Sequence, residues 1–307
     1  MRAAETVDPH PNAQRQMSLE SLSRSREISD AELVWAEIER LNLEPHIVEL
    51  EAKGFTVVPP EKATTPEFVD RCRTKILEVA ERRHGARPNL ETGGTHERPE
   101  IPFGQLLFYM LFEDPVFQEA VLNPVGLALT HYLLGRSAVL SNCIAGIKGP
   151  GGEDLNLHAD NVMIPPPFPS YAQVCNVTLL LTDYDKEAGA LCHVPNSHRL
   201  CRHPYPGEAL GERVPIIAPA GSIVFWHGNT WHGAFARTKR GLRINLIMAM
   251  MRSYMRPQER YREDVTQEIL DRNPPQFATL MGKHIDYGWR EEGHDFGVTY
   301  PGRTLWD

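Results

Sequence analysis

Three residues have types and spacing suited to binding one metal ion: His158 and Asp160, separated by Ala159, and His232 far downstream. Successive side chains of a β-strand point to opposite faces, so His158 and Asp160 would share a face while Ala159 points away. A histidine from a distant strand completes a face of two histidines and one carboxylate, which leaves the other metal positions open, as in non-haem Fe(II) oxygenases. The sequence therefore predicts an iron site at His158, Asp160 and His232.

An arginine follows at a distance that suits a co-substrate site. Arg243 comes after His232 with ten residues between them. Its guanidinium stays charged and presents a planar fork of donors, which fits the far carboxylate of a dicarboxylate bound to the iron. Asn245 has the same strand parity as Arg243, so its amide is a second candidate for that carboxylate; the alternative is an ordinary asparagine of the core. We expect Arg243 and Asn245 to bind the co-substrate.

The other histidines test how specific this pattern is. A second triplet, His284-Ile285-Asp286, is followed only by His294, with no arginine at a comparable distance, and we interpret it as surface. His227 competes with His232 for the third ligand position, but the spacing to Arg243 favours His232 and leaves His227 in a turn. Structural or pocket-lining roles are expected for three further histidines: His193, His198 and His203.

Composition narrows the class of protein. The chain has 307 residues, 41% of them hydrophobic, and a net charge of -8 without a long basic run, which disfavours nucleic acid as a partner. No apolar run is long enough to cross a bilayer, and the first thirty residues lack the hydrophobic stretch of a secretory signal. Five cysteines without regular spacing indicate reduced thiols. We expect a cytoplasmic protein that acts on a small molecule; a homo-oligomer is compatible with the sequence.

The distribution of helix and strand signals predicts one elaborated domain. Residues 1–28 contain few large apolar side chains and are expected to form a disordered tail, followed by a single domain over 29–307. Within it, residues 29–135 are mainly helical, because Thr65-Pro66 and Asp114-Pro115 each combine an N-cap with a proline in the first turn. Residues 256–307 are expected to form a helical extension with a tail.

The middle of the chain, residues 136–255, changes to strands. Runs rich in β-branched and aromatic residues alternate with turn residues, without intervening helical patterns. This arrangement is typical of an antiparallel sandwich or jelly roll rather than a parallel α/β sheet. The predicted strands cover residues 138–148, 155–162, 173–182, 221–226 and 243–250.

Several motifs in order give the chain a family resemblance. A strand begins at Gly54-Phe55-Thr56-Val57-Val58, and a turn at Gly189-Ala190-Leu191 is followed by Val194-Pro195-Asn196-Ser197-His198. The segment from Gly221 to His227, continuing to His232-Gly233, resembles the strand that carries the last histidine. Over roughly residues 46–255 the chain resembles the phytanoyl-CoA dioxygenase family of Fe(II)- and 2-oxoglutarate-dependent oxygenases.

This resemblance implies an all-β core, the double-stranded β-helix or jelly roll, with helices around it. It implies that His158, Asp160 and His232 hold Fe(II), that 2-oxoglutarate chelates the metal, and that Arg243 pairs with its distant carboxylate. Oxygen would take the last position, and oxidative decarboxylation to succinate and carbon dioxide would drive hydroxylation of a C–H bond. Related halogenases lack the carboxylate, so Asp160 disfavours halogenation.

Some positions depart from the family pattern or bear on the substrate. The family's "PGSH" element corresponds to Pro195-Asn196-Ser197-His198 here, so Asn196 replaces its usual glycine. Ala159 and Ala234 stand where relatives often carry a polar side chain.

A proline-rich loop, residues 165–169, is stiff because each proline fixes φ. Met163, Tyr171 and Trp231 are expected near this loop. The loop and these residues either border a site for an apolar or aromatic substrate or pack the mouth of the barrel. The sequence has no cluster of basic residues that would bind the phosphates of coenzyme A.

Two alternatives use the same residues differently. A cupin-like metalloenzyme would use the metal ligands without 2-oxoglutarate and leave Arg243 as a structural ion-pair partner. A non-catalytic member of the family would serve as a binding or scaffold protein. The complete set of metal ligands together with Arg243 disfavours both.

Overall fold

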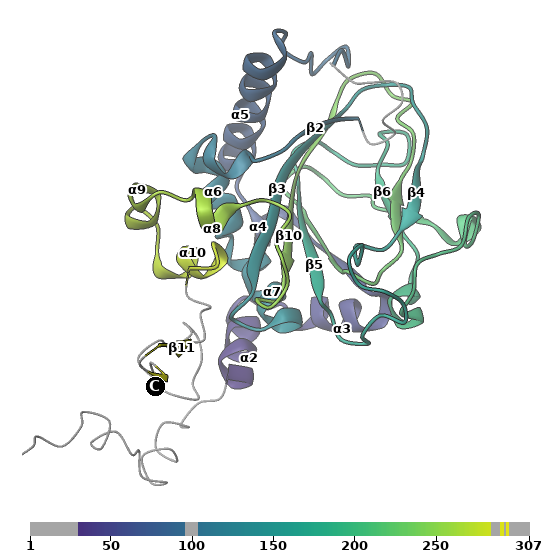
Figure 1. The fold of residues 1–307 in the computed structure, drawn as a ribbon. Coiled ribbons are helices and arrows are strands. Elements are labelled where there is room, and N and C mark those ends of the chain that lie inside the picture. Colours follow the sequence, from purple (N-terminus) through teal and green to yellow (C-terminus); the bar gives the residue numbers. More distant parts are fainter. Residues whose placement is uncertain (1–29, 96–103, 284–288, 292, 295–307) are drawn as a thin grey trace, which may run out of the picture.

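A computed structural model describes residues 30–95, 104–283, 289–291 and 293–294. The predicted tail at 1–28 and the second triplet, His284-Ile285-Asp286, lie outside these residues. The described chain folds into a β-sandwich of the jelly-roll type with helices against one side (Figure 1), which confirms the predicted fold class.

The sandwich consists of two antiparallel sheets that face each other across an interior. The larger sheet has the order β1-β8-β5-β10-β3-β2, and the smaller has the order β4-β9-β6-β7. Every strand pair is antiparallel. The strands of the larger sheet are β1 (Phe55–Val58), β2 (Gln105–Leu107), β3 (Val139–Lys148), β5 (Val174–Leu180), β8 (Ile223–His227) and β10 (Arg243–Met251). The smaller sheet contains β4 (Leu155–His158), β6 (Leu191–His193), β7 (Val214–Pro215) and β9 (His232–Ala234), and a separate hairpin pairs β11 (Trp289–Arg290) with β12 (Gly293–His294).

Helices before β3 begin where capping residues and prolines predict. Thr65 accepts a hydrogen bond from the Phe68 N–H at the start of the long helix α5, and Asn123 caps α7 in the same way, next to Pro124. Gly54 ends α3 in the left-handed region at φ 87° and leads directly into β1. The helices are α2 (Asp30–Arg40), α3 (Glu44–Lys53), α4 (Pro60–Ala63), α5 (Pro66–His84), η2 (Met110–Phe112), α6 (Pro115–Val121), α7 (Pro124–Leu134), η3 (Ser197–Leu200), η4 (Leu210–Glu212), α8 (Tyr261–Asp264), α9 (Gln267–Asp271) and α10 (Pro275–Leu280).

Alternation along the strands of the larger sheet divides the interior into two cores. On β10, Ile244, Leu246 and Met248 belong to the core between this sheet and the helices. The intervening positions face the space between the two sheets, where Val224 and Trp226 of β8 form a second core. Arg243 and Asn245 have the parity of this second face, so strand alternation alone turns them into the sandwich.

One expectation about an element boundary was wrong. The strand predicted over 155–162 ends at His158, because the next residues leave the sheet and the Asp160 N–H bonds to the Gly228 carbonyl oxygen instead. The segment expected to be helical after residue 256 contains helices in its described part, three short ones that are separated by extended backbone at Val265 and Pro274.

Two further expectations concern cysteines and membranes. All five cysteines are unpaired thiols, as expected. Across the described ranges, no helix combines the length and the hydropathy that crossing a bilayer would require.

Candidate metal centre

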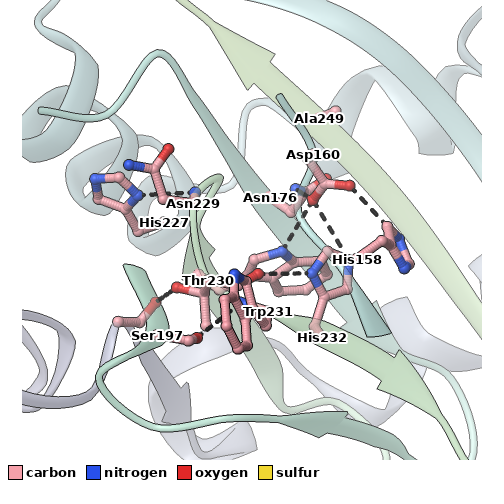
Figure 2. Close-up of polar contacts among 12 residues, drawn as sticks. His158, Asp160, Asn176, Ser197, His227, Asn229, Thr230, Trp231, His232 and Ala249 are labelled. Atoms are coloured by element: carbon pink, nitrogen blue, oxygen red, sulfur yellow. Dashed lines mark hydrogen bonds and ion pairs between the residues drawn. The ribbon is translucent and has the colours of Figure 1, made fainter. Parts of the chain in front are cut away.

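The three predicted ligands come together at the edge where the smaller sheet meets the interior. His158 ends β4, His232 opens β9, and the two are register partners. Ligand atoms of His158, Asp160 and His232 all lie within 4.8 Å of one another, with the His158 Nε2 3.8 Å and the His232 Nε2 3.4 Å from the Asp160 carboxylate. Figure 2 shows the three side chains turned toward one point. This spacing is compatible with one shared ion.

The backbone fixes the same tautomer on both histidines. His158 Nδ1 lies 2.9 Å from the Asn156 carbonyl oxygen, and His232 Nδ1 lies 3.0 Å from the Thr230 carbonyl oxygen. A carbonyl oxygen only accepts, so both Nδ1 atoms carry the proton and both Nε2 atoms keep a lone pair. Such an outer hydrogen bond orients histidine ligands in metal sites.

Two donors hold the Asp160 carboxylate. Asn176 Nδ2 on β5 and Trp226 Nε1 on β8 donate to the same oxygen, Oδ2, over 2.6 Å and 3.1 Å. Since Asp160 lies beyond the end of β4, strand geometry does not orient it, and these two side chains of the opposite sheet do. Ala159 points the other way and is buried beside Phe168 and Trp231, as predicted.

A network of hydrogen bonds holds the turn that leads to His232. The Thr230 hydroxyl donates to the Gly54 carbonyl oxygen, and the Trp231 N–H donates to the Ser197 hydroxyl. Asn196, where the family has glycine, is in the left-handed region at φ 65°, which asparagine tolerates better than most residues. The departure therefore keeps the local backbone that places Ser197.

Burial keeps the ring of His232 neutral. It lowers the pKa of His232 to about 4, against the attraction of Asp160, which raises it. A neutral imidazole is the form that binds a metal ion. His193 lies opposite His232 in the register and stacks on it at 5.8 Å between ring centroids, and burial also lowers its pKa. Its side chain is not part of the group that converges on Asp160.

His227, the competing candidate, lies elsewhere. It ends β8 rather than occupying a turn, and its ring faces His198 at 5.6 Å between centroids. Its Nδ1 accepts a hydrogen bond from the Asn229 N–H. The rings of His198 and His203 likewise take no part in the three-residue cluster.

A cavity of about 560 Å³ opens beside the three predicted ligands. His158, Asp160 and His232 line its inner end, and Val162, Met163 and Tyr254 lie at exposed positions on its wall. The volume is that of a small-molecule site. Tyr171, which the sequence placed near the pocket, lines a different cavity beside Leu133 and His198.

The opposite end of the sandwich interior is positively charged. Arg243 is 3% exposed, donates from Nη1 to the Gly189 carbonyl oxygen at 2.6 Å, and keeps a buried Nε without a partner in the described structure. Nearby Arg237 is also buried, but its guanidinium donates to three backbone carbonyl oxygens, those of Gly241, Ala188 and Arg240. Arg237 is therefore satisfied by the protein, whereas Arg243 retains donor capacity.

Neighbours of Arg243 extend this polar end. Asn245 is 1% exposed, and neither its amide oxygen nor its nitrogen has a hydrogen-bond partner in the described chain. Lys148 on β3 is the register partner of Arg243 and is fully buried, and its ammonium already donates to the Glu153 and Phe235 carbonyl oxygens. Burial raises the pKa of Tyr184, whose ring lies under the Arg243 guanidinium at 5.6 Å, and Arg243 opposes that shift. Buried polar groups normally find partners, so this cluster is suited to an anionic ligand.

Sequence reasoning missed the side chains that support these two clusters. Asn176, Trp226 and Lys148 lie in strands predicted correctly, at positions whose parity faces the sandwich interior. Polar or indole side chains at inward positions of a core strand are the signal that would have identified them. The pairing of Asn176 with Asp160, across two sheets, has no counterpart in local sequence.

Comparison with known proteins agrees with this geometry. Residues 50–244 match the profile of the phytanoyl-CoA dioxygenase family. "Dioxygenase af480" of Aspergillus fumigatus is 28% identical over 254 residues, which cover 80% of this chain and 79% of that protein.

Solved structures share the fold at lower identity. HygX of Streptomyces hygroscopicus, with nickel and 2-oxoglutarate bound, has a TM-score of 0.55 at 15% identity over 70% of this chain and 88% of its own. SnoK, a non-haem α-ketoglutarate-dependent carbocyclase of nogalamycin biosynthesis, has a TM-score of 0.56 at 21% identity over 76% of this chain and 91% of its own. With the matched profile spanning more than half of its length, the chain belongs to the phytanoyl-CoA dioxygenase family.

Proposed function

We propose that this protein is a non-haem Fe(II)- and 2-oxoglutarate-dependent dioxygenase that hydroxylates a C–H bond of a small organic substrate. The observation that carries the proposal is the pairing of two sites in one interior: a cluster of two histidines and one carboxylate, and a buried arginine with an unpaired Nε. Bound together, the metal, 2-oxoglutarate and oxygen supply an oxidative decarboxylation that yields succinate and carbon dioxide and oxidises the substrate.

The residues present fit this set of cofactors. His158, Asp160 and His232 provide the nitrogen and oxygen donors that Fe(II) takes in this arrangement, with positions left open. The Nε2 lone pairs are available because both Nδ1 protons are donated to backbone carbonyl oxygens. Asn176 and Trp226 hold the Asp160 carboxylate in place.

Arg243 and its neighbours fit the far carboxylate of 2-oxoglutarate. A buried guanidinium without an acidic partner is costly, and a dicarboxylate ligand would neutralise it. Asn245 and Lys148 lie beside it, and the Thr178 hydroxyl lies between the two ends on β5, buried and without a partner in the described chain. A cupin-like enzyme without 2-oxoglutarate would have no use for this donor capacity.

Hydroxylation is the outcome that the retained Asp160 favours over halogenation, because the carboxylate occupies the position that a halide would need. Two structural neighbours, SnoN and SnoK, are described as an epimerase and a carbocyclase. Products must therefore be identified directly, by mass spectrometry of the oxidised substrate together with succinate.

The test is an anaerobic titration of the Fe(II)-loaded protein with 2-oxoglutarate. The absorbance of the visible charge-transfer band of the chelate monitors binding. We expect the band in the native protein. Arg243→Ala should weaken 2-oxoglutarate binding by about 100-fold, the loss expected for charge-assisted hydrogen bonds to a buried carboxylate.

Arg237→Ala is the matched control, because it removes a buried guanidinium of the same region whose donors are already taken by backbone carbonyl oxygens. It should lower stability and leave the affinity of folded protein for 2-oxoglutarate within a few-fold of the native value. No band in fully iron-loaded native protein, or equal losses in both variants, would refute the co-substrate assignment.

A further inference from the structure

The wall of the cavity beside the metal ligands is nearly uncharged. Among its described lining residues, apart from the two histidines, only Asp160 and Arg256 are ionic; Asp160 faces the histidines, and Arg256 is exposed at the mouth. Val174 and Met251, two residues of an apolar cluster, and Met255, which packs against that cluster, contribute to the outer wall. A ligand that fills this space is therefore predominantly apolar.

Three lining residues keep a buried polar atom with no partner in the described chain: Asn161 (Oδ1), Gln173 (Nε2) and Thr178 (Oγ1). Thr178 lies midway on β5 between Asn176, which holds Asp160, and Leu180, the register partner of Asn245. Asn161 follows Asp160 directly; its Nδ2 donates to Asn229 Oδ1, so the atom it leaves unpaired is an acceptor, Oδ1, beside the three predicted ligands. Gln173 precedes β5 at the opposite, outer end, so its unpaired donor is left for the substrate.

The Gln173 amide is fixed from its other side. It is 4% exposed, and its Oε1 accepts a 2.6 Å hydrogen bond from the Tyr254 hydroxyl. That bond occupies the amide oxygen and leaves the Nε2 hydrogens as the groups without a protein partner. The other amides of the outer wall differ, because Asn142 donates to Gln258 and its oxygen accepts from the Ala249 N–H.

We propose that Gln173 is a specificity-determining residue that donates a hydrogen bond to a carbonyl or hydroxyl oxygen of a neutral, mostly apolar substrate, with Tyr254 holding its amide in position. This inference rests on the proposed oxygenase function and names its substrate class. Gln173 and Asn176 are three residues apart in extended chain, which is about 10 Å. The recognised oxygen and the oxidised carbon therefore lie at different ends of a molecule at least two rings in size.

The test compares two probes of one skeleton, 1-tetralone and tetralin, which differ by the ketone oxygen. Their affinities are measured by saturation-transfer NMR on the native protein, on Gln173→Leu and on Tyr254→Phe. The native protein should bind the ketone about tenfold more tightly, because the hydrocarbon leaves the amide N–H buried and unpaired. In Gln173→Leu the ratio should fall to about one, and Tyr254→Phe should retain only a part of the preference, about threefold.

Stability separates substrate recognition from a structural role. Leucine replaces a buried, partly unsatisfied amide with a side chain of similar size, so the Tm of Gln173→Leu should equal or exceed that of the native protein. Tyr205→Phe, an exposed tyrosine outside the cavity lining, is the control for Tyr254→Phe and should keep the full ketone preference. If Gln173→Leu does not fold, Tyr254→Phe decides.

Each measurement is made on the metal-free protein and on the Fe(II)–2-oxoglutarate complex. Equal native affinities for the two probes, no binding of either, or a preference that survives Gln173→Leu overturns the proposal. A missing charge-transfer band would instead refute the oxygenase assignment, while the ketone preference of the metal-free protein would be judged independently.

Discussion

Replacing Trp226 by phenylalanine tests whether the Asp160 carboxylate, a predicted ligand, must be held from the opposite sheet. The indole N–H donates to Asp160 Oδ2 at 3.1 Å, and the same ring packs on His232 at 5.0 Å between centroids. Phenylalanine keeps an aromatic ring at that place and removes the donor. Asp160 then keeps a single side-chain donor, Asn176, on that oxygen and gains freedom to rotate away from the two histidines.

The expected magnitude follows from the kind of bond that is lost. A hydrogen bond to a charged group contributes about 1.5–3 kcal/mol. The 3.1 Å distance and the 25% exposure of the Asp160 side chain favour the lower end of that range. About 1.5 kcal/mol corresponds to a tenfold weaker metal affinity, within the range of about 10–100-fold seen when an outer partner of a metal ligand is removed.

The assay is anaerobic Fe(II) titration in competition with a chromophoric chelator, with Trp231→Phe as the matched control. Trp231 also donates its indole N–H, at 2.7 Å, but to the carbonyl oxygen of Arg202. We expect the control to lose stability while its folded form binds Fe(II) within about threefold of the native affinity, because no carboxylate ligand loses a donor. Native-like affinity of Trp226→Phe, or an equal loss in Trp231→Phe, would refute the reasoning.

Two further predictions concern stability. Burial, and then the neighbouring His198, lower the pKa of His227 from 6.5 to about 4. The folded state therefore favours the neutral ring, and the free energy of unfolding has its full value above pH 6.5 and decreases as the pH falls toward 4. Between pH 7.5 and 5.0, the free energy of unfolding measured with urea should fall by about 2 kcal/mol more in the native protein than in His227→Asn. The control His84→Asn should lose as much as the native protein. Gly54→Ala should cost about 1–3 kcal/mol by thermal unfolding, because a Cβ there would lie 2.5 Å from His198 Nδ1 and the Thr230 hydroxyl at φ 87°. A native-like Tm for Gly54→Ala would show that this turn is not constrained.

Local patterns determined most of the secondary structure. Capping residues with prolines placed the starts of α5 and α6, and strand-forming runs placed β1, β3, β5, β8 and β10 within two residues at each end. These signals are local, because caps satisfy the first N–H groups of a helix and alternation separates the two faces of a strand. Strands β6, β7 and β9 span two or three residues, too few for periodicity to register.

For the candidate site, the sequence by itself determined the residue types: His158, Asp160 and His232, with Arg243 and Asn245 turned inward by strand parity. The tertiary structure alone decided how Asp160 is oriented, since β4 ends before it and Asn176 and Trp226 hold it from the facing sheet. It also decided that Arg243 keeps an unpaired donor while Arg237 does not. The physical reason is that hydrogen-bond satisfaction depends on groups distant in sequence, and only the closed sandwich brings them within reach.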